Sequence, residues 1–157
     1  MRGSPAVLPL AAALLLGGCI RHSPLPRQME TAFGPVRLGV PWNPVDLTGV
    51  GPGDTIVGLP AGAIQGGGRV TVYRAADGTV RRVWRDYPQS VDFDRLSGDL
   101  RRQYGLPAVH ERSADPEAPE RVVWEDPRTR LELIRDPRRS VATVYGLLVD
   151  RLPLRAD

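Results

Sequence analysis

The side chains best suited to chemistry are few in this chain, and their spacing does not assemble a recognisable catalytic site. The sequence holds one cysteine, Cys19, and two histidines, His22 and His110. A zinc site needs closely grouped His, Cys or acidic ligands, and an α/β-hydrolase needs a Gly-x-Ser-x-Gly turn. The sequence contains neither pattern. We therefore expect no catalytic residue, no metal and no cofactor.

Acidic residues leave one enzymatic alternative open. Asp92, Asp94 and Asp99 are close in sequence, but helix capping and a solvated helix face explain them. Glycosidases use paired carboxylates whose proximity a sequence does not reveal. A hydrolase acting on cell-wall sugar or peptide is therefore the alternative to a non-enzymatic role.

Cys19 follows an apolar run that has the layout of a secretory signal. Arg2 precedes an uncharged stretch from Pro5 to Leu16, and two glycines lead into the cysteine. Such signals combine a short basic start with about 7–15 apolar residues and a small-residue cleavage site. The run is too short for a transmembrane helix, which needs roughly 20 apolar residues.

The sequence Leu16-Gly17-Gly18-Cys19 resembles the lipobox of bacterial lipoproteins. The resemblance implies cleavage between Gly18 and Cys19, a diacylglycerol on the Cys19 sulfur and acylation of the new amine. The alternative is a plain signal peptide followed by a free thiol. By analogy with Gram-negative lipoproteins, Ile20 in place of an aspartate favours the outer membrane, with the domain facing the periplasm.

Composition limits the choice of partners. The chain carries 21 basic residues, all of them arginine, and its formal net charge of +3 is too small to indicate a nucleic-acid-binding protein. With Cys19 lipidated, no cysteine remains for a disulfide, so a hydrophobic core must stabilise the domain. We expect a signal peptide at 1–18, a flexible lipidated tether at 19–32, one domain at 33–150 and a tail at 151–157.

The clearest early unit is a β-hairpin over 69–87, with its turn at Asp77-Gly78. A two-residue loop would place Val70 opposite Arg85. A three-residue loop, Ala76-Asp77-Gly78, places Val70 opposite Trp84 and is preferred, because it gathers more apolar side chains on one face. That face would carry Val70, Val72, Val80 and Trp84, and the opposite face Thr71, Tyr73, Arg81, Val83 and Arg85. Before the hairpin, we expect short strands at 36–40 and 55–59 and a brief helix after Asn43.

A helix is expected over residues 92–104. Asp92 is a good N-cap, and Phe93, Leu96, Leu100 and Tyr104 form one apolar stripe. Gly105 suits the positive-φ position after the helix. An exposed loop containing His110 should follow over 108–119.

Three antiparallel strands are expected over 120–149, joined by turns at Asp126-Pro127-Arg128 and Asp136-Pro137-Arg138. Placing Asp126 opposite Thr129 sets Trp124 against Leu131 and Glu125 beside Arg130. The last strand then directs Ala142, Val144 and Leu148 inward. Its other face, with Val141, Thr143, Tyr145 and Leu147, is apolar enough to indicate either a covering segment or a contact surface.

These elements predict an α+β protein, a two-layer sandwich with the 92–104 helix on one face of an antiparallel sheet. The lipobox, the Tyr104-Gly105-x-Pro107 helix exit and Trp124 before a Leu131-x-Leu133 strand resemble small envelope lipoproteins, the class that includes the outer-membrane assembly lipoprotein and the similar β-lactamase-inhibitor-protein fold. The resemblance implies a role in binding other proteins.

The principal expectation is an outer-membrane-anchored periplasmic lipoprotein with a structural or protein-binding role. Its candidate surface is the outward sheet face, with Tyr73, Arg81, Arg85 and Tyr145, since aromatic and arginine side chains are common interface anchors. The expected partners are the membrane, through lipid on Cys19, and an envelope protein, with no nucleic acid. A further alternative is contact of arginines with anionic lipid or lipopolysaccharide phosphates.

Overall fold

The computed structural model describes residues 22–31, 34–42, 56–59, 68–140 and 142–152. Cys19, Gly18, the expected helix after Asn43 and most of the expected tail lie outside these residues. The described elements are β1 (Gln28–Thr31), β2 (Gly34–Arg37), β3 (Ile56–Leu59), β4 (Val70–Arg74), β5 (Val80–Asp86), α1 (Phe93–Tyr104), β6 (Val109–Glu111), β7 (Glu120–Glu125), β8 (Thr129–Arg135) and β9 (Val144–Asp150). No helix in this part of the chain has the length and apolar character needed to cross a bilayer.

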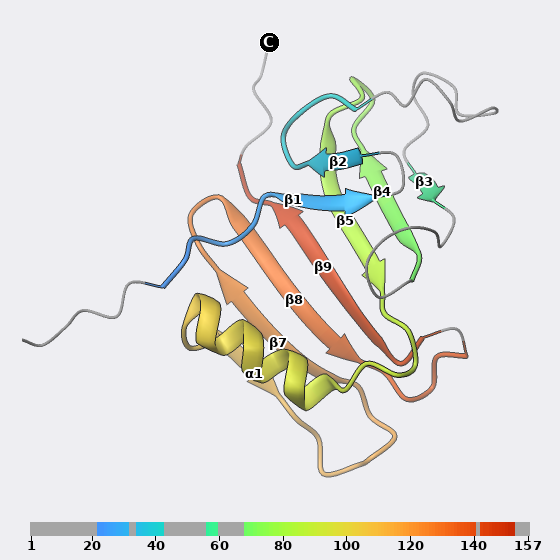
Figure 1. Ribbon diagram of the computed structural model, residues 1–157, viewed down its shortest axis with the longest axis vertical. Helices are drawn as coiled ribbons and strands as arrows, with labels where there is room; N and C mark the ends of the chain where they lie inside the picture. The colour runs from blue at the N-terminus through green and yellow to red at the C-terminus, as the bar shows by residue number, and fades with distance from the viewer. Residues whose placement is uncertain (1–21, 32–33, 43–55, 60–67, 141, 153–157) are drawn as a thin grey trace, which may run out of the picture.

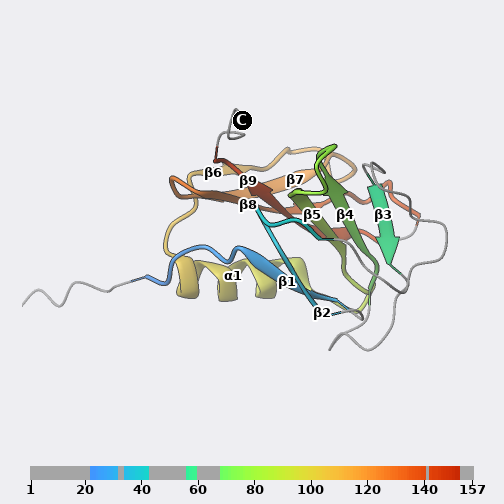
Figure 2. The ribbon, with the colours of Figure 1, turned by 90° about the horizontal axis from the view of Figure 1, so that it is seen from above.

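The fold is a two-layer α+β sandwich, as the sequence predicts. Seven strands form one antiparallel sheet in the order β3-β4-β5-β9-β8-β7-β6 (Figure 1). Seen from above, α1 lies on one side of this sheet, and β1 and β2 lie beside it on the same side (Figure 2). The second layer therefore consists of a helix and a β-hairpin.

The core lies between these two layers. The sheet contributes valines at 70, 72, 83, 122 and 144, together with Trp124, Leu133 and Leu148, and the second layer contributes Leu25, Val36, Leu38 and Phe93. All are buried. The hairpin lies over β4, β5 and β9, and α1 lies over the β7–β8 side of the sheet (Figure 1).

Residues 22–31 are packed against the domain, which corrects the expected flexible tether over 19–32. Leu25 is buried in the core. Arg27 donates to the Leu38 carbonyl, the Arg128 carbonyl and the Asp150 carboxylate. Residues 28–31 then pair with β2. The proline- and serine-containing composition suggested flexibility, whereas one apolar anchor and one buried ion pair hold the segment in place. The domain thus includes residues 22–31 and does not begin at 33.

Helix α1 begins and ends where its capping residues place it. The Asp92 side chain accepts a hydrogen bond from the Arg95 amide, and Gly105 follows the helix with φ 87°. The buried Trp124 Nε1 donates to the Gly105 carbonyl at 3.0 Å. The residue that ends the helix therefore also satisfies the one polar group of a large core side chain.

The strands after the helix have the expected register. Trp124 pairs with Leu131, Val122 with Leu133, and Glu125 with Arg130. Two turn aspartates, Asp126 and Asp136, accept hydrogen bonds from the backbone ahead of them. The expected loop over 108–119 is partly wrong, because β6 pairs with β7 and the His110 ring contacts Glu120.

The early hairpin combines the two registers that the sequence allowed. Near the turn, Arg74 pairs with Val80 and Gly78 has φ 81°, as the three-residue loop predicts. One extra residue in β5, Arg81, then shifts the register, so Val70 pairs with Arg85. This β-bulge reverses the faces of the later residues: Val83 is buried opposite Val72, and Trp84 points to the other side.

Candidate functional site

The candidate site lies on the sheet face opposite α1 and the β1–β2 hairpin, which we call the open face. Figure 2 shows both second-layer elements on one side of the sheet, so no other described element covers the open face. Alternation along β5, β7, β8 and β9 sends every second side chain to this face. The open face divides into two regions of different chemistry.

The first region is a continuous series of ion pairs over β6, β7 and β8, which we call the ion-pair chain. Its members are Glu111, Arg121, Glu132, Arg130, Glu125 and Arg151, and successive members lie 3.5, 3.3, 2.7, 3.2 and 3.2 Å apart. Arginines and glutamates balance one another in number, and the long side chains cover the buried Val123 beneath. This region is self-neutralised. The exposed pairs at its two ends contribute little energy, whereas Glu132 at its centre is only 12% exposed.

The second region is an aromatic–arginine group over β4, β5 and β9, which we call the aromatic cluster. The rings of Trp84 and Tyr145 stack with centroids 4.4 Å apart and planes 12° apart. The Arg139 guanidinium lies over both rings, 5.1 Å from the Trp84 centroid and 4.5 Å from that of Tyr145. Beside them, Arg82 lies over the Tyr73 ring at 5.5 Å.

Asp86 fixes the geometry of the aromatic cluster. One of its carboxylate oxygens, Oδ1, accepts from Trp84 Nε1 at 2.9 Å and from Arg139 at 2.8 Å. Partial burial raises the pKa of the Tyr145 phenol above its usual value, and the Arg139 charge opposes that rise. The phenol therefore stays neutral at physiological pH and offers a hydroxyl donor next to the Arg139 guanidinium and the Trp84 indole.

The four surface residues predicted from the sequence lie on two different faces of the sheet. Tyr73 and Tyr145 lie on the open face, as expected. Arg81 and Arg85 lie on the inner face, because the bulge reverses β5. There Arg81 binds the buried Asp150 carboxylate, and Arg85 lies over the Tyr87 ring at 4.8 Å. Sequence reasoning missed Trp84, Arg82, Arg139 and Asp86; only the bulge, which no residue type signalled, brings Trp84 to Tyr145.

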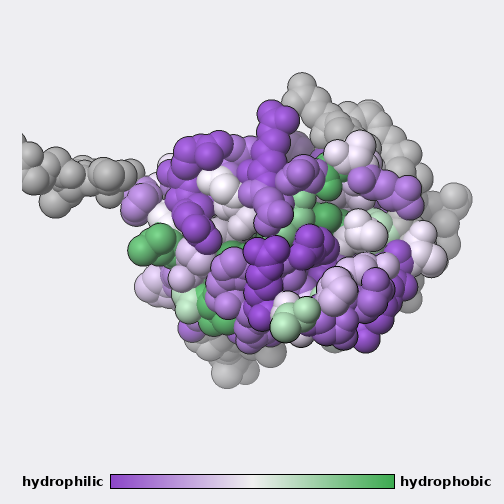
Figure 3. Space-filling model, turned by 90° about the horizontal axis from the view of Figure 1, so that it is seen from below, coloured by the Kyte–Doolittle hydropathy of each residue, from purple (hydrophilic) through white to green (hydrophobic). Residues whose placement is uncertain are grey.

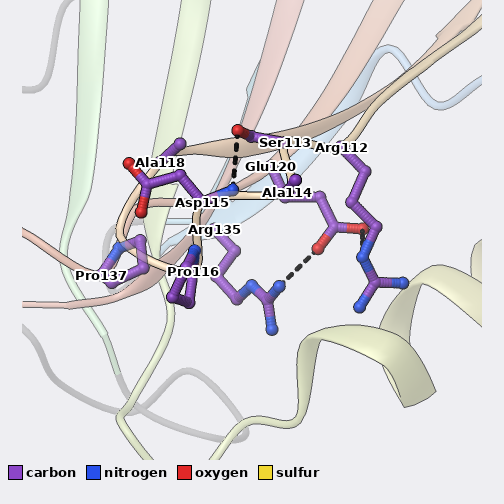
Figure 4. A pocket seen from close by; sticks show the side chains of 9 residues that line it. All are labelled: Arg112, Ser113, Ala114, Asp115, Pro116, Ala118, Glu120, Arg135 and Pro137. Atoms are coloured by element: carbon purple, nitrogen blue, oxygen red, sulfur yellow. Dashed lines mark hydrogen bonds and ion pairs between the residues drawn. The ribbon is translucent and has the colours of Figure 1, made fainter.

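A separate pocket lies between the 112–119 loop and the β8–β9 turn. Its cavity volume is about 330 Å³, and Glu120 lies at its base with only 2% of its surface exposed. Arg135 and Arg112 approach the Glu120 carboxylate from either side (Figure 4), at 2.5 and 3.8 Å. The His110 ring adds a contact at 2.9 Å. Charge-assisted contacts to both carboxylate oxygens tie the loop to the sheet.

This pocket is poorly suited to acid–base chemistry. Both Glu120 oxygens already contact cationic or histidine side chains, and the Asp115 carboxylate accepts the Glu117 amide within its own loop. The Glu120 carboxylate therefore has no oxygen free of such a contact. Among the described residues, no group of three or more His, Cys or acidic side chains is placed to hold a metal ion. Viewed from below, the molecule is mostly hydrophilic, with apolar residues in small separate patches (Figure 3).

No protein-family model and no curated protein sequence matches this chain. Among solved structures, a DUF4309 family protein (YjgB) from Bacillus subtilis has a similar arrangement, with 14% sequence identity and a TM-score of 0.42. The match covers 64% of this chain and 68% of that chain. A likeness at this level carries no argument about function.

Proposed function

We propose that this protein is a lipid-anchored, non-enzymatic component of the bacterial cell envelope, held in the outer membrane and facing the periplasm, which binds another envelope protein through the aromatic cluster. The lipobox-like Leu16-Gly17-Gly18-Cys19 supports the anchor. The observation that carries the binding role is the Trp84–Tyr145 stack under Arg139 on the open face.

Three features of the aromatic cluster suit protein recognition. Trp, Tyr and Arg are the residue types most enriched among energetically dominant interface positions. The rings are held in place before binding by the Asp86 contacts, which lowers the ordering cost of association. The Arg82 and Arg139 guanidinium groups lie over the rings, where they can donate hydrogen bonds to acidic side chains of a partner.

The occupied carboxylates of the Glu120 pocket disfavour the alternative of a cell-wall hydrolase. A general acid must present its proton to the leaving group, and a glycosidase needs a second carboxylate across the scissile bond. We infer instead that the contacts of Glu120 serve to hold the 112–119 loop against the sheet.

Removing both stacked rings should abolish partner binding while the fold persists. We expect Trp84→Ala with Tyr145→Ala to reduce capture of the envelope partner, measured by crosslinking in membranes and quantitative pull-down, by at least tenfold, since a dominant interface residue contributes about 2 kcal/mol or more.

The matched control is Arg130→Gln, which breaks two ion pairs on the same face without touching the cluster. It should leave capture unchanged. Equal capture by the double variant and the native protein, with both folded by circular dichroism, would sink the proposed binding role.

A further inference from the structure

The start of the described chain is clamped onto one end of the domain. The Ser23 amide donates to the Gln103 carbonyl at 3.0 Å, and the Leu25 amide donates to the Asp126 carboxylate at 3.3 Å. These contacts attach the segment to both the last turn of α1 and the β7–β8 turn. The chain is therefore held at the end of the sheet where β7 finishes.

The clamp extends to His22, the first described residue. A Cβ placed on Gly105 would lie 2.8 Å from His22 Cδ2, so the imidazole packs directly against the glycine that ends α1. Only two residues, Ile20 and Arg21, separate His22 from Cys19. Three residue steps at 3.3–3.6 Å each span at most about 11 Å, even when fully extended. A lipidated Cys19 thus cannot hold the domain far from the bilayer.

We propose that this end of the domain lies directly against the bilayer surface, an inference that rests on the proposed lipidation of Cys19. We call the surface the anchor pole and define it by His22, Ser23, Arg101, Leu106 and Arg128. The surface that the anchor pole contacts is an anionic phospholipid bilayer. The pole must lie close to it because only two residues separate His22 from Cys19.

The chemistry of the anchor pole fits a membrane surface. Leu106 is 83% exposed, the most exposed large hydrophobic side chain of the described residues. Two exposed arginines belong to the same end of the domain: Arg101 in the last turn of α1 and Arg128 in the β7–β8 turn. An apolar side chain together with cations suits insertion among acyl chains, with the guanidinium groups at lipid phosphates.

The acidic groups at the anchor pole already have partners. Asp99 pairs with Arg102, and Glu125 pairs with Arg130 and Arg151. The Asp126 carboxylate accepts from the backbone amides of Leu25, Arg128 and Thr129. Arg101 and Arg128 are consequently the cations of this pole that remain available to a negatively charged surface.

Contact at the anchor pole sets the orientation of the whole domain. The 112–119 loop and the Glu120 pocket lie at the start of β7, whereas the pole lies at its far end, so the length of β7, about 20 Å, separates them. In Figures 1 and 2 the described chain begins at one end of the two layers, not above or below them. The open face is then directed along the membrane surface, and the Glu120 pocket away from it.

Site-specific fluorescence quenching tests this orientation. With Cys19 acylated, a cysteine introduced by Leu106→Cys is the only free thiol and takes a fluorophore; Glu117→Cys in the exposed 112–119 loop is the matched distal control. The labelled, membrane-extracted protein is placed in phosphatidylcholine–phosphatidylglycerol vesicles containing headgroup spin-labelled lipid. We expect loss of fluorescence at position 106 and none at 117.

A third variant tests whether the short connection between Cys19 and His22 keeps the anchor pole at the bilayer. Inserting about 12 Gly/Ser residues between Ile20 and Arg21 allows a root-mean-square span of about 19 Å, and should relieve the quenching at 106. Equal signals at 106 and 117 in the acylated protein would overturn the inference while leaving the lipid anchor intact. Quenching that persists at 106 alone in the insertion variant would support the inference, and would mean that Leu106 and the arginines themselves hold the pole at the bilayer. An intact mass without acyl chains would overturn the anchor and the inference together.

Discussion

Asp150→Ala should lower the free energy of unfolding by about 3 kcal/mol, because it leaves two guanidinium groups facing a vacated buried position. The Asp150 side chain is fully buried, and its two oxygens bind Arg27 at 2.8 Å and Arg81 at 3.1 Å. These arginines come from the N-terminal segment and from the bulge in β5. The carboxylate therefore joins three segments that are distant in sequence.

The matched control for this prediction is Asp99→Ala, which removes an ion pair of the same type on the exposed surface of α1. Its effect should stay below about 1 kcal/mol, because exposed pairs are solvated and screened. Urea unfolding followed by tryptophan fluorescence measures both. Similar small losses for the two variants would mean that residues 22–31 do not belong to the folded domain.

Trp124→Ala should cost about 4 kcal/mol, the range found when a large buried aromatic side chain is removed. Only 2% of the Trp124 surface is exposed, and its ring belongs to the hydrophobic core. The substitution creates a cavity and also leaves the Gly105 carbonyl without its indole donor. The last turn of α1 and the segment between α1 and β6 should both become less stable.

Trp124→Phe separates these two contributions. It retains most of the ring volume but not the donor, so we expect a loss of about 1–2 kcal/mol, the cost of one unsatisfied buried acceptor. Denaturant midpoints of the three proteins give the comparison. An alanine variant no less stable than the phenylalanine variant would contradict the assigned packing role of Trp124.

Local signals predicted the second half of the chain well. Around α1, the Asp92 cap, the apolar stripe and Gly105 all indicated the same helix. For β7 and β8, turn chemistry at Asp126 and side-chain alternation gave one register, and the structure has it. Where two independent local signals agree, the nonlocal fold has little freedom to depart from them.

The errors arose where a nonlocal contact outweighed a local pattern. The bulge at Arg81 is stabilised by the Asp150 carboxylate, 69 residues away, and by burial of Val83 against Val72. The sequence rules for turns do not include such distant contacts, so they do not predict the bulge. Residues 22–31 read as a flexible tether because their composition is polar and proline-containing, while Leu25 and Arg27 find partners about 100 residues later. The same bulge places Arg81 and Arg85, two of the four residues of the predicted surface, on the inner face.

The corrected face changes which variants can report on binding. Charge reversal at Arg81 would break the Asp150 contacts, so a loss of binding there would reflect damage to the fold. Trp84 and Tyr145 are partly exposed and stand outside the main core, so their removal tests the surface itself.

The anchor at Cys19 supports both the proposed envelope location and the contact at the anchor pole, and the intact mass of the native, membrane-extracted protein tests it most directly. We expect a mass equal to residues 19–157 plus acyl chains, with the lipid on the N-terminal peptide. A mass without lipid, from a chain that retains a free Cys19 thiol, would contradict the account and remove the reason to seek a partner at the membrane.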